Sequence, residues 1–182
     1  MMSQLARIIM HLYPHARPAQ DWYLAEVRGA DGEPVVQIAH WDEQAIGSPK
    51  PNEQELLAQA DTVRLEQAKA AKIEAIDARS EHLLTAGLEV AEGKVISTSE
   101  AAQRNLLMLS VGVQMGSITL PQGVSTVDGG EYVITDANDL KRIQDLWTQR
   151  MTSVLDAGRA LRQQVIAAAT VDEVDAIVDD RE

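Results

Sequence analysis

Apolar residues in the first part of the chain change from helical spacing to strand-like alternation. Four of them recur at i, i+3, i+4 and i+7 and predict a one-sided helix: Leu5, Ile8, Ile9 and Leu12. Pro14 and Pro18 end this helix. Residues 22–28 and 35–41 have the character of strands on either side of a turn at 29–32, so a β-hairpin is predicted to follow.

A bend at residues 47–52, which contains two prolines, separates this hairpin from a long helical segment. Asn52 is suited to cap a helix that is predicted to run from about residue 53 to about residue 85. Its apolar residues at heptad spacing, which Asp77 interrupts, are Leu56, Val63, Ala70 and Leu84. Two interpretations stay open: a surface helix packed on its own domain, or a coiled-coil stem that joins several copies.

The last part of the chain alternates short strands with one-sided helices. Strands are predicted at residues 94–96, 118–120 and 131–135. The predicted helix caps are Ser97, in a capping box with Glu100, then Asp136 for a long helix to about residue 168, and Thr170 for a short one. The acidic end, residues 179–182, is predicted to fray.

These patterns together predict a helix-rich α+β fold in three parts. Residues 1–52 would be a small N-terminal docking unit, built from a helix and a β-hairpin. Residues 53–87 would be the long central helix. Residues 88–182 would be a C-terminal helix-and-strand unit with a long closing helix.

Charge and cysteine content exclude several classes of protein. The formal net charge of -12 argues against nucleic acid and against an anionic membrane as partners, since both attract basic surfaces. No apolar stretch approaches the roughly 20 residues that cross a bilayer. The chain has no cysteine, which excludes disulfides, thiolate catalysis and Cys-ligated zinc.

The remaining candidate chemistry is sparse. His11 and His15 have the i, i+4 spacing of a helical metal site, but Pro14 lies between them. The acidic residues after Thr170 lack the central Gly and the twelfth-position Glu of a calcium loop. No Gly-x-Ser-x-Gly elbow, dinucleotide fingerprint or P-loop is present. We therefore expect no catalytic residue, cofactor or metal, and a protein that is not an enzyme.

Aromatic residues are rare and concentrate near the start of the chain. Trp22, Tyr23 and Trp41 are the candidate partner-binding residues, because partly exposed rings beside polar residues are typical interface anchors. The alternative is that these rings form the core of a small unit, which needs every large side chain it has.

Two parts of the chain resemble phage proteins. The first resembles small phage tail-region proteins through these segments: Tyr13-Pro14, Asp21-Trp22, Ile38-Ala39-His40-Trp41 and the run from Pro49 to Leu57. The last part is similar to a domain of unknown function at the C-terminal end of many phage tail-fibre and fibre-assembly proteins. The matching segments are 95–98, 102–107 and the helix at 136–168.

The resemblance implies a non-enzymatic structural protein of a bacteriophage tail, associated with the fibre or baseplate and linking tail components for host attachment. It would be made in the host cytoplasm and reside in the virion tail. Its partners would be other tail or fibre proteins and further copies of itself. The alternatives are a tail-fibre assembly chaperone that is absent from the mature virion, and a small enzyme with a scattered site.

Overall fold

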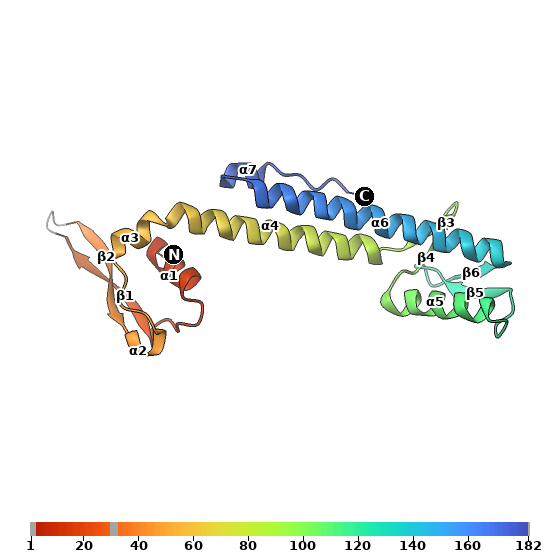
Figure 1. Ribbon diagram of the computed structural model, residues 1–182, viewed down its shortest axis with the longest axis horizontal. Coiled ribbons are helices and arrows are strands. Elements are labelled where there is room, and N and C mark those ends of the chain that lie inside the picture. The colour runs from red at the N-terminus through yellow and green to blue at the C-terminus, as the bar shows by residue number, and fades with distance from the viewer. Residues whose placement is uncertain (1–2, 30–32, 182) are drawn as a thin grey trace. The chain divides into compact units, whose positions relative to one another are not determined.

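The computed structural model describes residues 3–29 and 33–181. Within them the chain divides into two compact units, Met1–Ala68 (unit 1) and Lys69–Glu182 (unit 2). Helices predominate, and the strands form three separate antiparallel pairs (Figure 1). The predicted helix-rich α+β fold is therefore confirmed.

Unit 1 consists of short helices around one long hairpin. Its elements are α1 (Gln4–Leu12), β1 (Trp22–Arg28), β2 (Pro34–Trp41), α2 (Glu43–Ile46), α3 (Glu53–Ala58) and the start of α4 (Ala60–Thr85). Helix α1 and both strands confirm the prediction. The turn predicted at 29–32 falls mostly on residues outside the described ranges.

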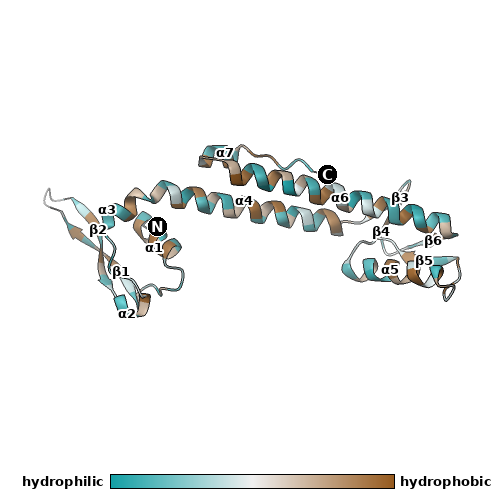
Figure 2. Ribbon diagram, viewed as in Figure 1, coloured by the Kyte–Doolittle hydropathy of each residue, from teal (hydrophilic) through white to brown (hydrophobic). Residues whose placement is uncertain are grey.

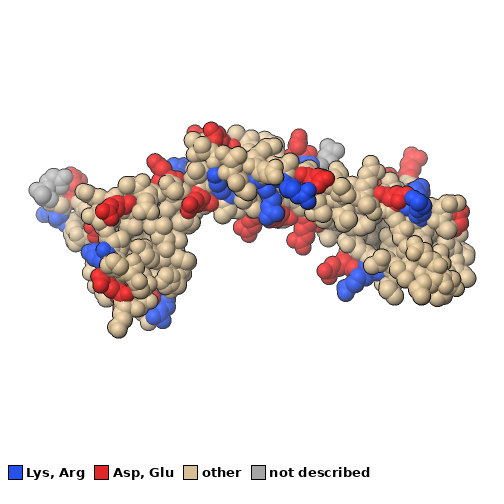
Figure 3. All heavy atoms as spheres, viewed as in Figure 1, with Lys and Arg blue, Asp and Glu red and all other residues tan. Residues whose placement is uncertain are grey.

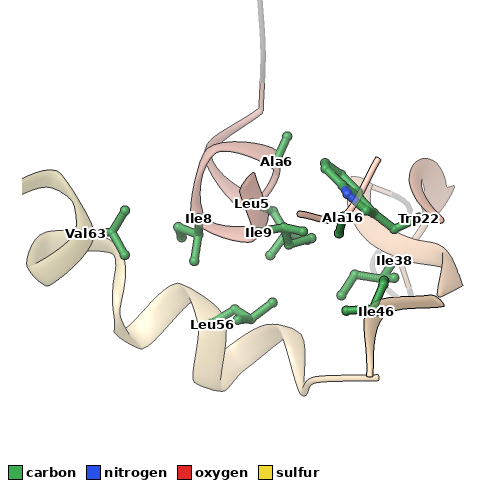
Figure 4. Packing of buried hydrophobic residues seen from close by; sticks show 10 residues of the cluster. All are labelled: Leu5, Ala6, Ile8, Ile9, Ala16, Trp22, Ile38, Ile46, Leu56 and Val63. Atoms are coloured by element: carbon green, nitrogen blue, oxygen red, sulfur yellow. The ribbon is translucent and has the colours of Figure 1, made fainter. Parts of the chain in front are cut away.

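A single apolar cluster holds unit 1 together. Figure 4 shows Ile8 and Ile9 of α1 facing Leu56 of α3, with Trp22 and Ile38 of the hairpin beside them. The other members are Leu5, Ala6, Ala16, Ile46 and Val63. Leu56 and Val63, which belong to the predicted long central helix, thus contribute to this core.

The predicted helix at 53–85 is two helices, α3 and α4, which meet at Gln59. The Gln59 N–H donates to the carbonyls of Leu56 and Leu57, so the backbone makes a tight turn there. Leu56 and Val63, on either side of the turn, are both buried in the core of unit 1. No proline or glycine marks the interruption, so helical spacing alone could not reveal it.

Unit 2 combines two long helices with a small helix-and-strand head. Its elements after α4 are β3 (Leu88–Ala91), β4 (Lys94–Ile96), α5 (Glu100–Gln114), β5 (Gln122–Ser125), β6 (Glu131–Ile134), α6 (Ala137–Ala167) and α7 (Val171–Asp175). Asp136 and Thr170 cap α6 and α7 as predicted. Strand β3 was not predicted.

Within unit 2, α4 runs antiparallel to α6 (Figure 1). Lys69 donates to the carbonyl of Ile166 near one end of the pair, and Arg150 donates to the carbonyl of Leu83 near the other. Apolar and polar residues alternate along both helices (Figure 2). Ile76 and Leu83 of α4 are buried. These apolar side chains are therefore covered by the chain itself.

The head is built around aliphatic side chains. Its buried residues come from β3, β4, α5, β6 and α6: Leu88, Val90, Ile96, Leu109, Ile134, Leu140 and Ile143. Helix α5 contributes Leu109 and the partly buried Leu106 and Val113, which recur at helical spacing.

The strand predicted at residues 118–120 is wrong, because this segment completes the end of α5 instead. The N–H groups of Ser117 and Ile118 both donate to the carbonyl of Gly112, at 2.9 and 3.1 Å. The Ile118 side chain packs against Gly112, where an added Cβ would lie 2.4 Å from it. The strand begins only at Gln122.

The capping box predicted for α5 is also wrong. Ser99 caps the helix by accepting from the N–H of Ala102 at 3.3 Å. The backbone N–H of Ser97 instead donates to the carbonyl of Ser125 at 2.9 Å and ties β4 to β5. Ser97 and Ser99 are both suitable cap residues by type. Because the N–H of Ser97 pairs with β5, Ser97 continues the strand, and Ser99 caps the helix.

The last described residues do not fray as predicted. The Arg181 side chain, 8% exposed, lies in the seam between α4 and α6. It donates to the carbonyls of Ile76 and Val154 at 2.9 and 3.1 Å and to the Ser80 hydroxyl at 2.8 Å. Gly158 of α6 makes room for it, because an added Cβ would lie 2.7 Å from the guanidinium.

Candidate functional site

The structure places the three candidate partner-binding residues in different environments. Trp22 is only 3% exposed and belongs to the core of unit 1. Tyr23, the next residue along β1, is 48% exposed and stacks on the cross-strand His40 with ring centroids 5.4 Å apart. Trp41 is half-buried. Tyr23 is therefore the ring with the most surface free for a partner.

Trp41 is fixed by two contacts. Its ring packs edge-on against Tyr13 with a centroid distance of 4.9 Å. Its indole N–H donates to the carbonyl of Ser48 at 2.8 Å, which ties the end of β2 to the proline-containing bend. The buried indole N–H of Trp22, in contrast, has no hydrogen-bond partner among the described residues.

The loop before β1 is held by a carboxylate. Asp21, which is buried, accepts from the backbone N–H of Arg17 at 2.8 Å and from its guanidinium at 3.0 and 3.1 Å. These hydrogen bonds lower the pKa of Asp21 below its usual range. The ion pair positions the chain for the start of the hairpin.

His11 and His15 have separate partners. His11 Nε2 lies 2.7 Å from a carboxylate oxygen of Glu66, and His15 Nε2 lies 2.9 Å from the carbonyl oxygen of Ile46. Within the ranges that the structure describes, no three His, Cys, Asp or Glu side chains are grouped closely enough to hold a metal ion. The same part of the chain contains no helix with the length and apolar character that crossing a membrane requires.

The head of unit 2 contains a groove of about 720 Å³. It lies between α5, strands β4 and β5, and α6. Its apolar lining includes Leu88, Ile96, Leu106, Val124 and Trp147. Leu106 and Trp147 recur at helical spacing with the core residues Leu109 and Ile143, so their spacing indicates burial, and no local signal indicates that both also line a groove.

A hydrogen-bonded cluster at the start of α6 stabilises the head. The Tyr132 hydroxyl donates to Asp139 at 3.1 Å, and Arg142 donates to Asp139 at 2.8 Å and to the carbonyl of Val90 at 2.6 Å. Burial raises the pKa of Tyr132, and the Asp139 carboxylate raises it further. Burial alone would raise the pKa of Asp139, but hydrogen bonds from Arg142, Thr135 and Tyr132 together lower it. This cluster joins β3, β6 and α6.

Two family models match the chain, and they meet where the structure changes from one unit to the other. Residues 67–178 match a domain of unknown function (DUF4376), and the chain belongs to this family. Residues 5–68 match the model of the XkdW protein. Both families are associated with phages, which supports a phage origin for this chain. No curated protein and no solved structure matches the chain.

Proposed function

We propose that this protein is a non-enzymatic structural component of a phage tail, associated with the fibre or baseplate, that links two tail components. The observation that carries the proposal is the coincidence of two boundaries. The XkdW-like segment ends at residue 68 and the second family match begins at residue 67, where the two compact units divide. Two phage-associated units with separate cores suit a linker with one partner for each unit.

Unit 1 is the proposed docking unit. Tyr23 lies on the long hairpin with nearly half of its side chain exposed, and Trp41 is held half-buried at the end of the neighbouring strand. Tyrosine anchors interfaces well because its large ring has few rotatable bonds. Trp22 supports this surface from the core instead of contacting the partner.

Self-association is part of the proposal. The stem hypothesis assigned the apolar residues of the long helix to other copies, but Ile76 and Leu83 are buried by their own chain. Assembly through α4 would therefore have to use another face of the helix. Light scattering on the purified protein measures the copy number directly, and a monomer at high concentration would contradict this part of the proposal.

Virion composition is the direct test. Mass spectrometry of purified particles should detect the protein at a fixed ratio to known tail proteins, and labelled antibody should mark the tail in electron micrographs. A protein that is abundant during assembly but absent from particles would contradict the structural role and favour the assembly chaperone.

A pair of matched substitutions tests the docking surface. Tyr23→Ser should reduce incorporation into particles, whereas Leu57→Ser, at a residue of unit 1 with a similar exposure of 45%, should not. Both variants should keep the wild-type circular dichroism spectrum. Equal incorporation of the two variants would show that docking uses another surface.

A further inference from the structure

The edge of β5 that faces the groove is only partly paired. The backbone N–H of Thr126 donates to the carbonyl of Gly130, so the backbone polar groups of Thr126 face β6. Those of its neighbour Ser125 face the opposite edge, where the Ser125 carbonyl accepts from the N–H of Ser97, directly after β4. Because backbone groups alternate along a strand, the N–H and the carbonyl of Gly123 face the same edge as those of Ser125.

Pairing with β4 ends before it reaches Gly123. After Ser97 the chain leaves the strand and enters α5, whose cap is Ser99. In the described part of the chain, the register therefore leaves the N–H and the carbonyl of Gly123 without a ladder partner. Gly123 and Val124 both line the groove, so this open strand edge is one of its walls. A free strand edge is a template for a further strand.

The groove carries few charged side chains, although the chain has a net charge of -12. Its lining residues include Asp145, which pairs with Lys141, and Arg104, which lies 3.9 Å from Glu100. The Glu131 carboxylate lies against Gly123, in the space that a side chain at this position would fill. Figure 3 shows few charged side chains over the region of α5. A charged ligand would find little here to compensate the loss of its hydration.

The walls of the groove are held in place by hydrogen bonds. The Gln103 amide donates to the carbonyl of Thr98 at 2.7 Å, and the Gln144 amide donates to the Ser110 hydroxyl. Trp147 is half-buried, packs on the core of the head and exposes part of its ring to the groove. The site is thus preorganised, which lowers the cost of binding.

We propose that this groove binds an extended, uncharged segment of a partner protein, which adds a strand to the open edge of β5. The backbone of the segment pairs with Gly123, and one apolar side chain enters the groove against Leu106 and Trp147. Main-chain bonds supply affinity in this mode, and the pocket for alternate side chains supplies specificity. The inference rests on the proposed function for the identity of the partner as a tail component.

The test uses the full-length protein and a displayed library of random decapeptides. Selected peptides should be uncharged and should alternate apolar with polar residues. They should lose at least tenfold in affinity, about 1.4 kcal/mol, when the single amide that pairs with Gly123 is N-methylated. In nuclear magnetic resonance spectra of the complex, the Gly123 amide proton should become protected from exchange with water.

Two tryptophan substitutions on α5 provide the matched pair. Ala102 lines the groove, and Ala101, the preceding residue, is exposed and lies outside it. Ala102→Trp should fill the groove and weaken peptide binding at least tenfold, whereas Ala101→Trp should leave it unchanged. If Ala102→Trp fails to fold, the scan of N-methylated peptides on the wild-type protein still decides the question.

Three outcomes would overturn the proposal. The first is a library that yields no peptide binding to the wild-type groove, and the second is a set of bound peptides that tolerate N-methylation at every position. The third is a glycan array that gives ligands quenching the fluorescence of Trp147 while peptides do not bind. These outcomes are independent of virion composition. If the protein is found in particles but its groove binds no peptide, the proposed function stands and the groove proposal fails. If the groove binds peptides but the protein is absent from particles, the groove proposal stands and the structural role fails.

Discussion

Unit 1 is built around a single apolar cluster, whereas the seam between α4 and α6 in unit 2 combines spaced apolar contacts with a buried guanidinium. In unit 1, Trp22 and the isoleucines of α1 are almost fully buried together. In the seam of unit 2, Ile76 is buried beside Arg181, which bonds two backbone carbonyls and a hydroxyl. We therefore expect that truncating apolar side chains destabilises unit 1 more than the seam. Removing polar side chains should mainly destabilise the seam.

Replacing Trp22 by alanine should have the largest effect. Loss of a buried aromatic side chain costs about 3–5 kcal/mol, which is comparable to the whole stability of a unit of this size. Hydrogen exchange followed by mass spectrometry should show unit 1 unfolded and residues 69–181 still protected.

Trp22→Phe is the control that isolates the ring from its N–H group. Phenylalanine keeps most of the buried surface and removes an indole N–H that has no partner in the described structure. An unpaired buried donor costs about 1–3 kcal/mol, so its removal should offset the smaller ring. A loss as large as that of Trp22→Ala would mean that the N–H has a partner in solution.

Arg181→Ala should have the next largest effect, now in unit 2. The change leaves the carbonyls of Ile76 and Val154 without this donor and Asp179 without its charge partner, at a cost of about 2–3 kcal/mol. Chemical denaturation should show a lower midpoint for unit 2 alone. Arg162→Ala, which removes an exposed pair with Asp77, should change stability by less than about 1 kcal/mol.

Gly158→Ala tests whether the glycine exists to admit Arg181. In the wild-type background the new methyl group should displace the guanidinium, 2.7 Å away, and lower the stability of unit 2. In the Arg181→Ala background only the Ser80 Oγ, 3.0 Å from the new Cβ, stays close, and alanine favours helix over glycine, so the same change should cost clearly less stability. An equal loss in both backgrounds would exclude this role for Gly158.

The features that the sequence predicts correctly depend on neighbouring residues. Helix α1, strands β1 and β2 and the caps Asp136 and Thr170 follow from spacing and from side chains that bond the next turn. The features it misses depend on distant ones. The seam position of Arg181 follows from contacts with residues about a hundred positions away, such as Ser80 and Ile76, which no local pattern contains.

In the candidate sites, too, features set by neighbouring residues could be predicted and features set by distant residues could not. Trp22 and Tyr23 point to opposite faces of β1, so strand alternation could have placed one ring inside and the other outside. The groove of unit 2 could not be predicted in this way. Its walls come from α5, β5 and α6, and the open edge at Gly123 exists only because β4 turns away after Ser97.

The smallest expected effect is a loss of stability in acid, which each unit should show through its own ion pair. Hydrogen bonds from Arg17 lower the pKa of Asp21 in unit 1, and hydrogen bonds from Arg181 lower the pKa of Asp179 in unit 2. A carboxyl group with a lowered folded-state pKa stabilises the fold above its unfolded-state pKa, and this contribution is lost as the pH falls through the folded-state value. Both units should therefore lose stability in acid, below about pH 4.

Asparagine substitutions should separate the two contributions. Asp21→Asn should flatten the acid limb of the stability profile in unit 1 only, and Asp179→Asn should reduce it in unit 2 only. Unit 2 should keep some acid sensitivity, because Asp128 and Asp139 also have lowered pKa values. Hydrogen exchange measured between pH 3 and pH 6, resolved by peptide and corrected for intrinsic rates, reports both units in one sample. If Asp179→Asn leaves the acid limb of unit 2 unchanged, the ion pair with Arg181 is formed equally in the unfolded chain or is absent from the fold in solution.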